Sequence, residues 1–244
     1  MKPQFAILGA AALVMGTVHL SAYAWGDKDI EGNGKMTEQQ QSLGQVDEVN
    51  IAIPAHVTIK KGDRAELRIS AEENILAHIV IDLDGDELSL KAKRGYDLEP
   101  SKDIEVEITL SALEELNLAG SGDVKVEAFS GDHLDLGVAG SGDLDMAGAN
   151  YSDIDLDVAG SGDIRIGKGQ ADSMDISIAG SGSTSSQVKA SRVEVSIAGS
   201  GDVEVHAADK LDISIAGSGD VSYHGSPKLS QSIMGSGKVK QKGE

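Results

Sequence analysis

Hydrophobic and polar residues alternate strictly over the second half of the chain. Leu134, Leu136 and Val138, for example, are separated by Asp135 and Gly137. A period of two, rich in β-branched side chains, predicts strands with one buried face. The same alternation recurs in segments 154–158, 174–178, 193–197 and 211–215. We therefore expect their apolar side chains to form the core of an all-β fold.

A four-residue motif, Ala-Gly-Ser-Gly, follows each alternating segment, with methionine replacing alanine in the last copy. After the motif the alternation resumes briefly, as in Ile164-Arg165-Ile166. Each unit thus consists of a strand, a bend, a second strand and a short return. The seven copies begin 20, 20, 20, 19, 18 and 18 residues apart, at Ala119, Ala139, Ala159, Ala179, Ala198, Ala216 and Met234.

Two architectures fit this spacing. An antiparallel meander would make each bend a hairpin, and hairpins favour Asn-Gly or Asp-Gly turns between variable strands. A parallel solenoid stacks each unit on the last, so the same residue type recurs at every equivalent position. We therefore predict a right-handed parallel β-helix of 18–20-residue coils, with handedness taken from the usual crossover rule.

The bend itself is expected to depend on its glycines, because glycine adopts positive φ without a Cβ penalty. The small alanine is expected to point inward, and the stacked serine hydroxyls to hydrogen-bond along their column. The predicted structural glycines are Gly120, Gly122, Gly140, Gly142, Gly160, Gly162, Gly180, Gly182, Gly199, Gly201, Gly217, Gly219, Gly235 and Gly237.

The N-terminal half shows strand patterns without the repeat. Residues 25–45 are polar and are interpreted as a lead-in, either mobile or an irregular first coil. From Val46 short alternating segments recur, and 71–78 is expected to be a helical turn or a loop. We predict one domain over 46–244, in which 46–118 form irregular first coils covering one end of the core and 119–244 form the repeat coils.

The first 24 residues resemble a secretory signal. Lys2 precedes an apolar run of 16 residues, Phe5–Leu20, and Ala22-Tyr23-Ala24 is a small-x-small cleavage site. The run is short for a membrane span, although an uncleaved anchor is the alternative. We predict cleavage after Ala24, export, and no membrane span after signal removal.

Composition excludes several classes of function. The formal net charge of −19 opposes binding to nucleic acid and anionic membranes. The absence of cysteine excludes disulfides, zinc–thiolate sites and a lipid-modified cysteine. Glycine at 30 of 244 residues, with only 4 prolines, favours repeated tight turns. No cofactor is predicted.

The most regular polar feature is an aspartate directly after Gly-Ser-Gly. A solenoid would align these side chains as an outward ladder of carboxylates about 5 Å apart. Each aspartate could cap its bend by accepting backbone N–H groups, or the ladder could bind calcium weakly. The spacing does not match the nine-residue calcium repeat, so we favour the cap. The ladder comprises Asp123, Asp143, Asp163, Asp202 and Asp220.

Two further sets of residues recur in the repeats. The strands before the bend carry a second acidic column, interpreted as a solvated face that keeps the solenoid soluble or, less strongly, binds cationic partners. His206 and His224 occupy one repeat position and are expected to be neighbours; an exposed pair is favoured over a metal site. The second column is Asp135, Asp155, Asp157, Asp175, Glu194 and Asp212.

The C-terminal residues are basic, although the rest of the chain is acidic. Positive charge on a terminal edge strand opposes aggregation, so capping is the favoured interpretation. The alternative is head-to-tail pairing with an acidic neighbour. The residues are Lys228, Lys238, Lys240 and Lys242.

Parallel β-helices also include polysaccharide lyases and hydrolases. Such enzymes need paired acids in a cleft and aromatic platforms for sugar rings. Beyond residue 24 the chain has only Trp25, Tyr96, Phe129, Tyr151 and Tyr223 as aromatic side chains. The serines of the motif recur seven times, which suits a structural column better than one nucleophile. We predict no catalysis.

Four segments, 57–63, 71–74, 84–90 and 116–122, carry a resemblance to a known family. On these segments the chain resembles the bacterial DUF2807 family, the auto-transporter adhesin head GIN domain. The resemblance implies a parallel β-helix in an exported protein of the periplasm or cell surface. We expect a non-catalytic binding or structural module of the cell envelope, adhesin-like, with an envelope or surface partner. The alternatives are a polysaccharide-active enzyme and a calcium-dependent envelope protein.

Overall fold

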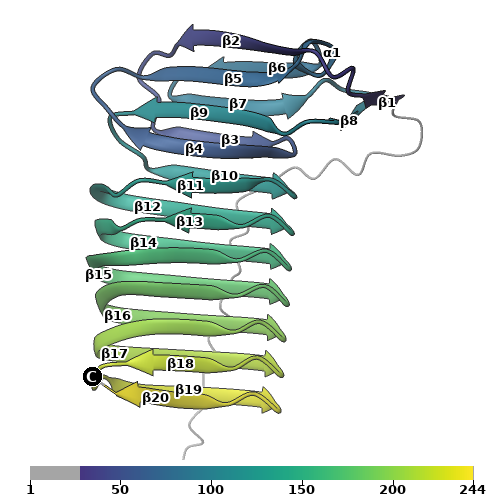
Figure 1. The fold of residues 1–244 in the computed structure, drawn as a ribbon. Coiled ribbons are helices and arrows are strands. Elements are labelled where there is room, and N and C mark those ends of the chain that lie inside the picture. Colours follow the sequence, from purple (N-terminus) through teal and green to yellow (C-terminus); the bar gives the residue numbers. More distant parts are fainter. Residues whose placement is uncertain (1–27, 244) are drawn as a thin grey trace, which may run out of the picture.

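The structure is a computed structural model that describes residues 28–243. The predicted signal segment and its cleavage after Ala24 lie outside the described residues. Within this range the chain is nearly all β and forms a β-solenoid of about six turns (Figure 1). The prediction of a solenoid of stacked coils is confirmed, and the antiparallel meander is excluded for the repeats because their coils pair in parallel.

One four-residue helix, α1 (Glu73–Leu76), accompanies the strands. The strands are β1 (Lys28–Glu31), β2 (Met36–Ser42), β3 (Glu48–Ala52), β4 (Ala55–Lys61), β5 (Glu66–Glu72), β6 (Ile79–Asp84), β7 (Glu87–Ala92), β8 (Tyr96–Glu99), β9 (Ile104–Leu110), β10 (Glu115–Gly120), β11 (Asp123–Val126), β12 (Phe129–Gly140), β13 (Leu144–Met146), β14 (Ala149–Gly160), β15 (Ile164–Gly180), β16 (Thr184–Gly199), β17 (Val203–Gly217), β18 (Val221–His224), β19 (Lys228–Gly235) and β20 (Val239–Gly243).

Successive repeats lie directly over one another in register. Leu156 of β14 aligns with Ile176 of β15, and Ile176 aligns with Val195 of β16. These inward side chains are at most 2% exposed, because each is covered by its counterparts one coil above and below. Stacked aliphatic rows therefore form one continuous core along the axis.

The alanine of the motif lies outside this core, contrary to expectation. Val158 faces inward and is 2% exposed, so strict alternation turns the following Ala159 outward, where it is exposed. The strand alternation thus continues through the alanine, and the chain bends only at the glycine after it.

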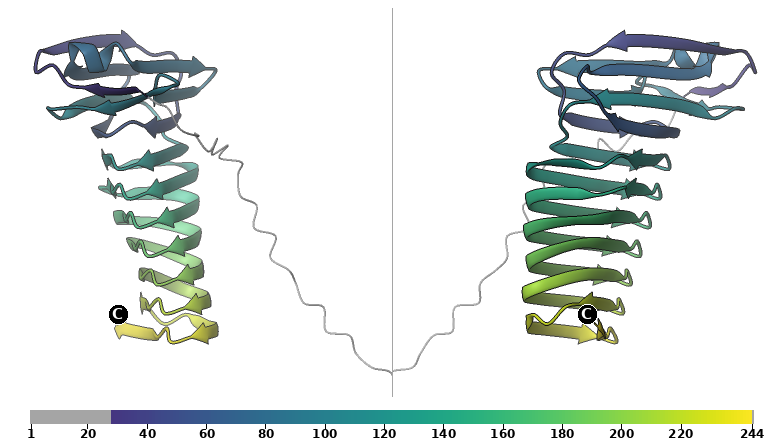
Figure 2. Two further views of the ribbon diagram at one scale, coloured as in Figure 1. Left: turned by 90° about the vertical axis from the view of Figure 1, so that its right-hand side faces the viewer. Right: turned by 60° about the vertical axis from the view of Figure 1, so that its left-hand side comes forward.

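The N-terminal region departs from simple coil order. Strands β3 and β4 lie beside β10 and β11, and on their other side they pair with β7 and β9. The first coil in the sequence, formed by β3 and β4, therefore lies between the coil of β7 and β9 and the coil of β10 and β11. Strands β5, β6 and β2 then add antiparallel pairs that widen this end (Figure 2).

The polar segment 25–45 contains two strands in its described part, where the sequence pattern indicated none. β1 pairs with β8, and β2 forms an antiparallel edge on β5. Of the two alternatives for 71–78, a helical turn or a loop, α1 is the helical turn, and its Ile75 is fully buried. Beside α1, the carboxylate of the buried Glu72 accepts a hydrogen bond from the hydroxyl of Ser101 at 2.7 Å. This bond lowers the pKa of Glu72. This carboxylate joins β5 to the loop before β9.

One inward position of the repeats carries an unpaired polar atom. Thr184 aligns with Ile164 and Val203, it is 1% exposed, and its Oγ1 has no hydrogen-bond partner. A buried hydroxyl without a partner costs about 1–3 kcal/mol.

Thr184→Val is therefore expected to stabilise the protein by about 1 kcal/mol, because valine keeps the shape and removes the unpaired hydroxyl. Urea unfolding measures the change. The control is Ser186→Val, since the Ser186 hydroxyl accepts the N–H of Val188 at 3.2 Å and its loss offsets the gain. A Thr184→Val variant less stable than wild type would contradict the assignment.

Candidate functional site

The bend is built from backbone groups of adjacent coils. The first glycine of each motif has positive φ, from +107° at Gly120 to +143° at Gly217. This conformation turns the next N–H toward the coil before it, so that Ser161 donates to the carbonyl of Gly140 at 2.8 Å. Ser161 itself is exposed. Within residues 28–243 no side-chain hydrogen bond joins two serines of the motif, contrary to the expected column of bonded hydroxyls. Backbone hydrogen bonds, and not serine hydroxyls, therefore connect the stacked bends.

The second glycine of each motif is needed for a different reason. Gly162 does not have positive φ, but a Cβ there would lie 2.1 Å from the carbonyl oxygen of Gly142. Neighbouring coils approach each other too closely at this point for any side chain. The expectation that both glycines adopt positive φ is thus wrong for the second one, which is selected by contact distance.

The aspartate ladder bonds to the next coil. Oδ1 of Asp202 accepts the N–H of Asp220 at 2.9 Å, and Oδ1 of Asp220 accepts the N–H of Lys238 at 2.8 Å. Asp163 and Asp143, two and three coils before Asp202, accept the N–H groups of Ser183 and Asp163 in the same way. Each of these carboxylates accepts a backbone N–H, as a cap does, but from the bend of the next coil and not from its own bend. Within residues 28–243 no group of three or more His, Cys, Asp or Glu side chains is arranged to hold a metal ion.

The capping role predicts a modest cost for removing one carboxylate. Asp202→Ala is expected to lower the free energy of unfolding by about 1 kcal/mol, because the N–H of Asp220 loses its acceptor. Asp202→Asn keeps an acceptor oxygen and should remain close to wild type in urea unfolding. A calcium ladder predicts instead that calcium raises the melting temperature of wild type and that Asp202→Asn abolishes this rise.

The second acidic column is partly buried. Asp135, Asp155 and Asp175 align on successive coils, followed by Glu194 and Asp212. Burial is the largest cause that raises the pKa of Asp135 to about 6, and carboxylates nearby, Glu115 first, add to it. The prediction of a fully solvated face is therefore only partly correct, because several carboxylates of this column are partly buried.

One residue assigned to this column lies beside it. Asp157 aligns with Gly137 and Ser177, two positions further along the strand than Asp155. Burial raises the pKa of Asp157 as well, and the hydroxyl of Ser177 partly opposes this shift. Because Asp157 follows Asp155 by two residues, both side chains face outward, on adjacent columns.

The raised pKa of Asp135 predicts a pH-dependent stability. The folded state binds this proton more tightly than the unfolded state, so the stabilisation is complete below about pH 4 and is lost as pH rises through about 6. Asp135→Asn is expected to stabilise the protein at pH 7 by on the order of 1 kcal/mol after solvent screening, and to have little effect at pH 4.

Urea unfolding at the two pH values measures this difference. Asp172→Asn makes the same charge change at an exposed position outside the column and serves as the control. An equal effect of Asp135→Asn at pH 4 and pH 7 would contradict the argument.

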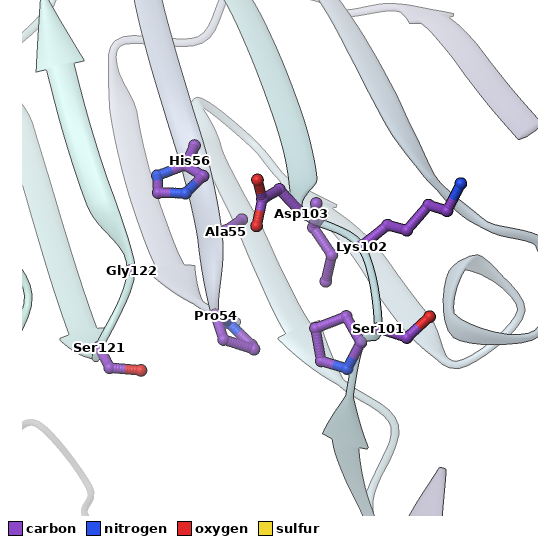
Figure 3. Close-up of a pocket in the computed structure, with 10 residues that line it drawn as sticks. Pro54, Ala55, His56, Ser101, Lys102, Asp103, Ser121 and Gly122 are labelled. Carbon is purple, nitrogen blue, oxygen red and sulfur yellow. The ribbon is translucent and has the colours of Figure 1, made fainter. Parts of the chain in front are cut away.

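A small pocket lies where the N-terminal region meets the first repeat, between the starts of β4 and β9 and the first bend (Figure 3). Its volume is about 140 Å³, below the roughly 300 Å³ at which small-molecule sites begin. Nδ1 of His56 lies 3.4 Å from Oδ2 of Asp123, a ladder residue that this contact ties to β4.

Serine, histidine and aspartate thus occur together at this pocket, but not as a catalytic triad. The Ser121 side chain points away from His56 (Figure 3), and within residues 28–243 no hydrogen bond joins the two. A nucleophile and its base must lie within hydrogen-bond reach. The pocket therefore lacks the central contact of that chemistry.

A larger groove follows one corner of the solenoid and has a volume of about 560 Å³. Side chains of the same strand position on successive coils line it: Asn150, Gln170 and Lys189. Tyr151 lines it as well; this residue is buried, and its hydroxyl donates to the carbonyl of Leu113 at 2.8 Å. No sequence pattern indicated this groove, because the corner segments vary in length and composition.

The two histidines of the repeat are neighbours, as predicted. His206 aligns with His224, and their ring centroids lie 6.2 Å apart. Nε2 of His224 lies 3.2 Å from Glu204, which also pairs with Lys242 at 2.6 Å. Burial, followed by the charges of Lys189 and His224, lowers the pKa of His206. The pair thus belongs to a polar network of the last coils.

Comparison with known proteins agrees with this architecture. The model of the family described as "Putative auto-transporter adhesin, head GIN domain", DUF2807, matches residues 45–227. This chain belongs to the DUF2807 family. The match spans the irregular coils and all but the last of the repeat coils. No curated protein matches the sequence.

Solved structures share the fold of this DUF2807 chain. An adhesin-named structure from Bacteroides fragilis is 22% identical, with a TM-score of 0.79 over 87% of this chain and 99% of its own. One from Parabacteroides merdae is 20% identical, with a TM-score of 0.69 over 88% and 99%. A structure named as a lipid-binding protein, from Parabacteroides distasonis, is 26% identical, with a TM-score of 0.71 over 88% and 99%.

Two structural findings bear on the possible partners of this DUF2807 chain. Over residues 28–243 the only helical segment, α1, is far too short to cross a membrane. The groove and the charged columns are the surfaces on which a ligand could contact several coils at once.

Proposed function

We propose that this protein is exported and serves in the bacterial cell envelope as a non-catalytic, adhesin-like binding module. Membership of a family described as adhesin heads supports the adhesin-like part. The corner groove is the observation that carries the proposal, since it joins side chains of consecutive coils into one surface. The small junction pocket, which lacks a serine–histidine bond, gives no comparable support for catalysis.

The groove has the chemistry of a site for a polar, extended chain. Coils stack about 4.8 Å apart, so Asn150, Gln170 and Lys189 offer amide and ammonium groups at a regular spacing. Ser152 and Ser191 add hydroxyls beside them. A polymer that repeats its own hydrogen-bonding groups, such as a surface polysaccharide, can contact several successive coils at once.

Binding assays on purified polysaccharides, lipid vesicles and envelope fragments test the proposal. The vesicles are included because one solved relative is named as lipid-binding. Gln170→Trp fills the groove and is expected to weaken polysaccharide binding on the order of tenfold or more. Gln187→Trp makes the same change at an exposed site outside the groove and should bind like wild type.

The alternatives give different results. Release of reducing or unsaturated ends from the polysaccharides would overturn the non-catalytic role. Binding to vesicles alone, unaffected by Gln170→Trp, would move the function away from the groove.

A further inference from the structure

The solenoid ends in four strands that are paired on one side only. At the N-terminal end of the stack these are β2, which pairs with β5, and β6, which pairs with β7. At the other end they are β19, which pairs with β17, and β20, which pairs with β18. Among residues 28–243 their outer backbone groups have no strand partner, so each end is a template for another strand.

Within residues 28–243, large apolar side chains are exposed only at these two ends. The large hydrophobic residues that are exposed within residues 28–243 are Met36 on β2, Leu83 on β6, and Leu229 and Met234 on β19. Met234 is 73% exposed, whereas the aliphatic rows between the ends are buried. Apolar side chains left exposed on an open strand edge favour contact with another surface there.

The two ends carry opposite charges. β2 and β6 contain the acids Glu38, Asp82 and Asp84 and no basic residue. β19 and β20 contain Lys228, Lys240 and Lys242 and no acidic residue. Glu38, Asp82 and Lys242 also form ion pairs within the chain, whereas Asp84, Lys228 and Lys240 form none among residues 28–243. The charges left over are acidic at one end and basic at the other, so like ends repel each other and unlike ends attract.

The strand order lets one stacked copy satisfy both edges together. β20 and β2 are the outermost strands of the same face of the solenoid. β20 pairs with β18 at the C-terminal end, and β2 pairs with β5 at the N-terminal end. β19 and β6 terminate the other face. A second copy placed along the axis brings its β2 beside β20 and its β6 beside β19.

We propose that copies of this chain associate head to tail, the basic C-terminal edges of one on the acidic N-terminal edges of the next. Such a heterologous contact does not close and produces linear stacks. The lysines then have two roles, because they prevent tail-to-tail pairing and select the acidic end. An anionic membrane is the competing partner for the basic end, but the net charge of −19 opposes it.

The contact is expected to be weak and reversible. A strand of seven residues spans about 23 Å and the two faces lie roughly 10 Å apart, so each end presents only a few hundred Å². Two such ends together bury well below the roughly 1,200 Å² at which stable complexes begin. Glutamines also replace aliphatic residues at the ends, since Gln39 aligns with Ile69 and Gln231 with Ile213. We therefore expect stacks at high concentration and monomers on dilution.

Sedimentation velocity over a range of concentrations of the purified protein tests the proposal, with two charge-reversal variants. E38K/D84K makes both ends basic and K228E/K240E makes both ends acidic. Each variant alone is expected to associate at least tenfold more weakly than wild type, and an equimolar mixture should restore association. Salt at 0.5 M should weaken wild-type stacking, because it screens exposed charges.

Controls carry the same charge changes away from the ends. D132K/D209K and K125E/K168E alter exposed residues on the sides of the solenoid and should associate like wild type. Wild-type circular dichroism and melting temperature establish that every variant is folded.

Three results would overturn the proposal. The first is a wild-type protein that stays monomeric at every concentration, and the second is a mixture that fails to restore association. The third is E38K/D84K associating like wild type, which indicates tail-to-tail pairing. Flotation with phosphatidylglycerol vesicles, lost in K228E/K240E and without self-association, would assign the basic end to membranes instead.

Discussion

Gly182→Ala is expected to destabilise the protein by about 3 kcal/mol or more. The new Cβ would lie 2.1 Å from the carbonyl oxygen of Gly162 and 2.7 Å from Cγ1 of Val158. The first contact is with backbone, which no rotamer change can relieve. The coils would have to separate locally, and the bonds between them, such as Ser181 N–H to Gly160 at 2.8 Å, would lengthen. Overpacking of this kind exceeds the usual cost of a surface substitution.

Two matched variants separate the contact from other effects. Ser181→Ala changes the exposed residue beside it and should stay within about 0.5 kcal/mol of wild type in urea unfolding. Gly120→Ala tests conformation alone, because φ is +107° but nothing lies within 4 Å of the added Cβ. Its cost should be about 1–3 kcal/mol. If Gly182→Ala were no worse than Ser181→Ala, the close stacking of the bends would be wrong.

The repeat made the solenoid predictable from the sequence. In a stacked fold each coil meets mainly its two neighbours, so one residue pattern reports the same contact several times. Leu156, Ile176 and Val195 could be aligned as one row because the motif after them fixes the register. The paired histidines followed from the same register.

The N-terminal topology could not be predicted in this way. β3 lies between β10 and β7, and no periodic motif marks such long-range pairing. Alternation indicates a strand and its buried face but not its neighbours or their direction. β2 showed no alternation at all, because an edge strand of sequence MTEQQQS remains exposed over nearly its whole length.

The candidate site was predictable only in part. The sequence indicated which residues recur, such as Asp202, but the choice between cap and calcium ligand needed the bond to the N–H of Asp220. The partial burial of Asp135 depends on the packing of its column, which composition does not report. The corner groove depends on three-dimensional stacking of Asn150 and Gln170, whose residue types differ between coils.

Ile176→Asp tests the stacked core on which every other assignment depends. Ile176 is 2% exposed in the middle of the repeat coils, with Leu156 on one side and Val195 on the other. Aspartate there loses the apolar burial of isoleucine and places a carboxyl group among aliphatic side chains without a partner. The expected cost exceeds about 4 kcal/mol, a large part of the total stability of an ordinary domain.

Two variants separate the effect of the buried charge from the effect of lost apolar volume and from that of an added carboxylate on the surface. Ile176→Val removes one methylene and should cost about 0.5–1.5 kcal/mol. Ser214→Asp introduces the same carboxylate at an exposed, outward position two coils away and should remain close to wild type. Ile176→Asp should lose its cooperative melting transition while both controls retain theirs. Because a solenoid is stabilised by contacts between neighbouring coils, hydrogen exchange should show the loss of protection to be greatest in β14, β15 and β16. Protection that persists in these three strands would mean that position 176 does not face the core, and the register of every repeat would have to shift by one residue.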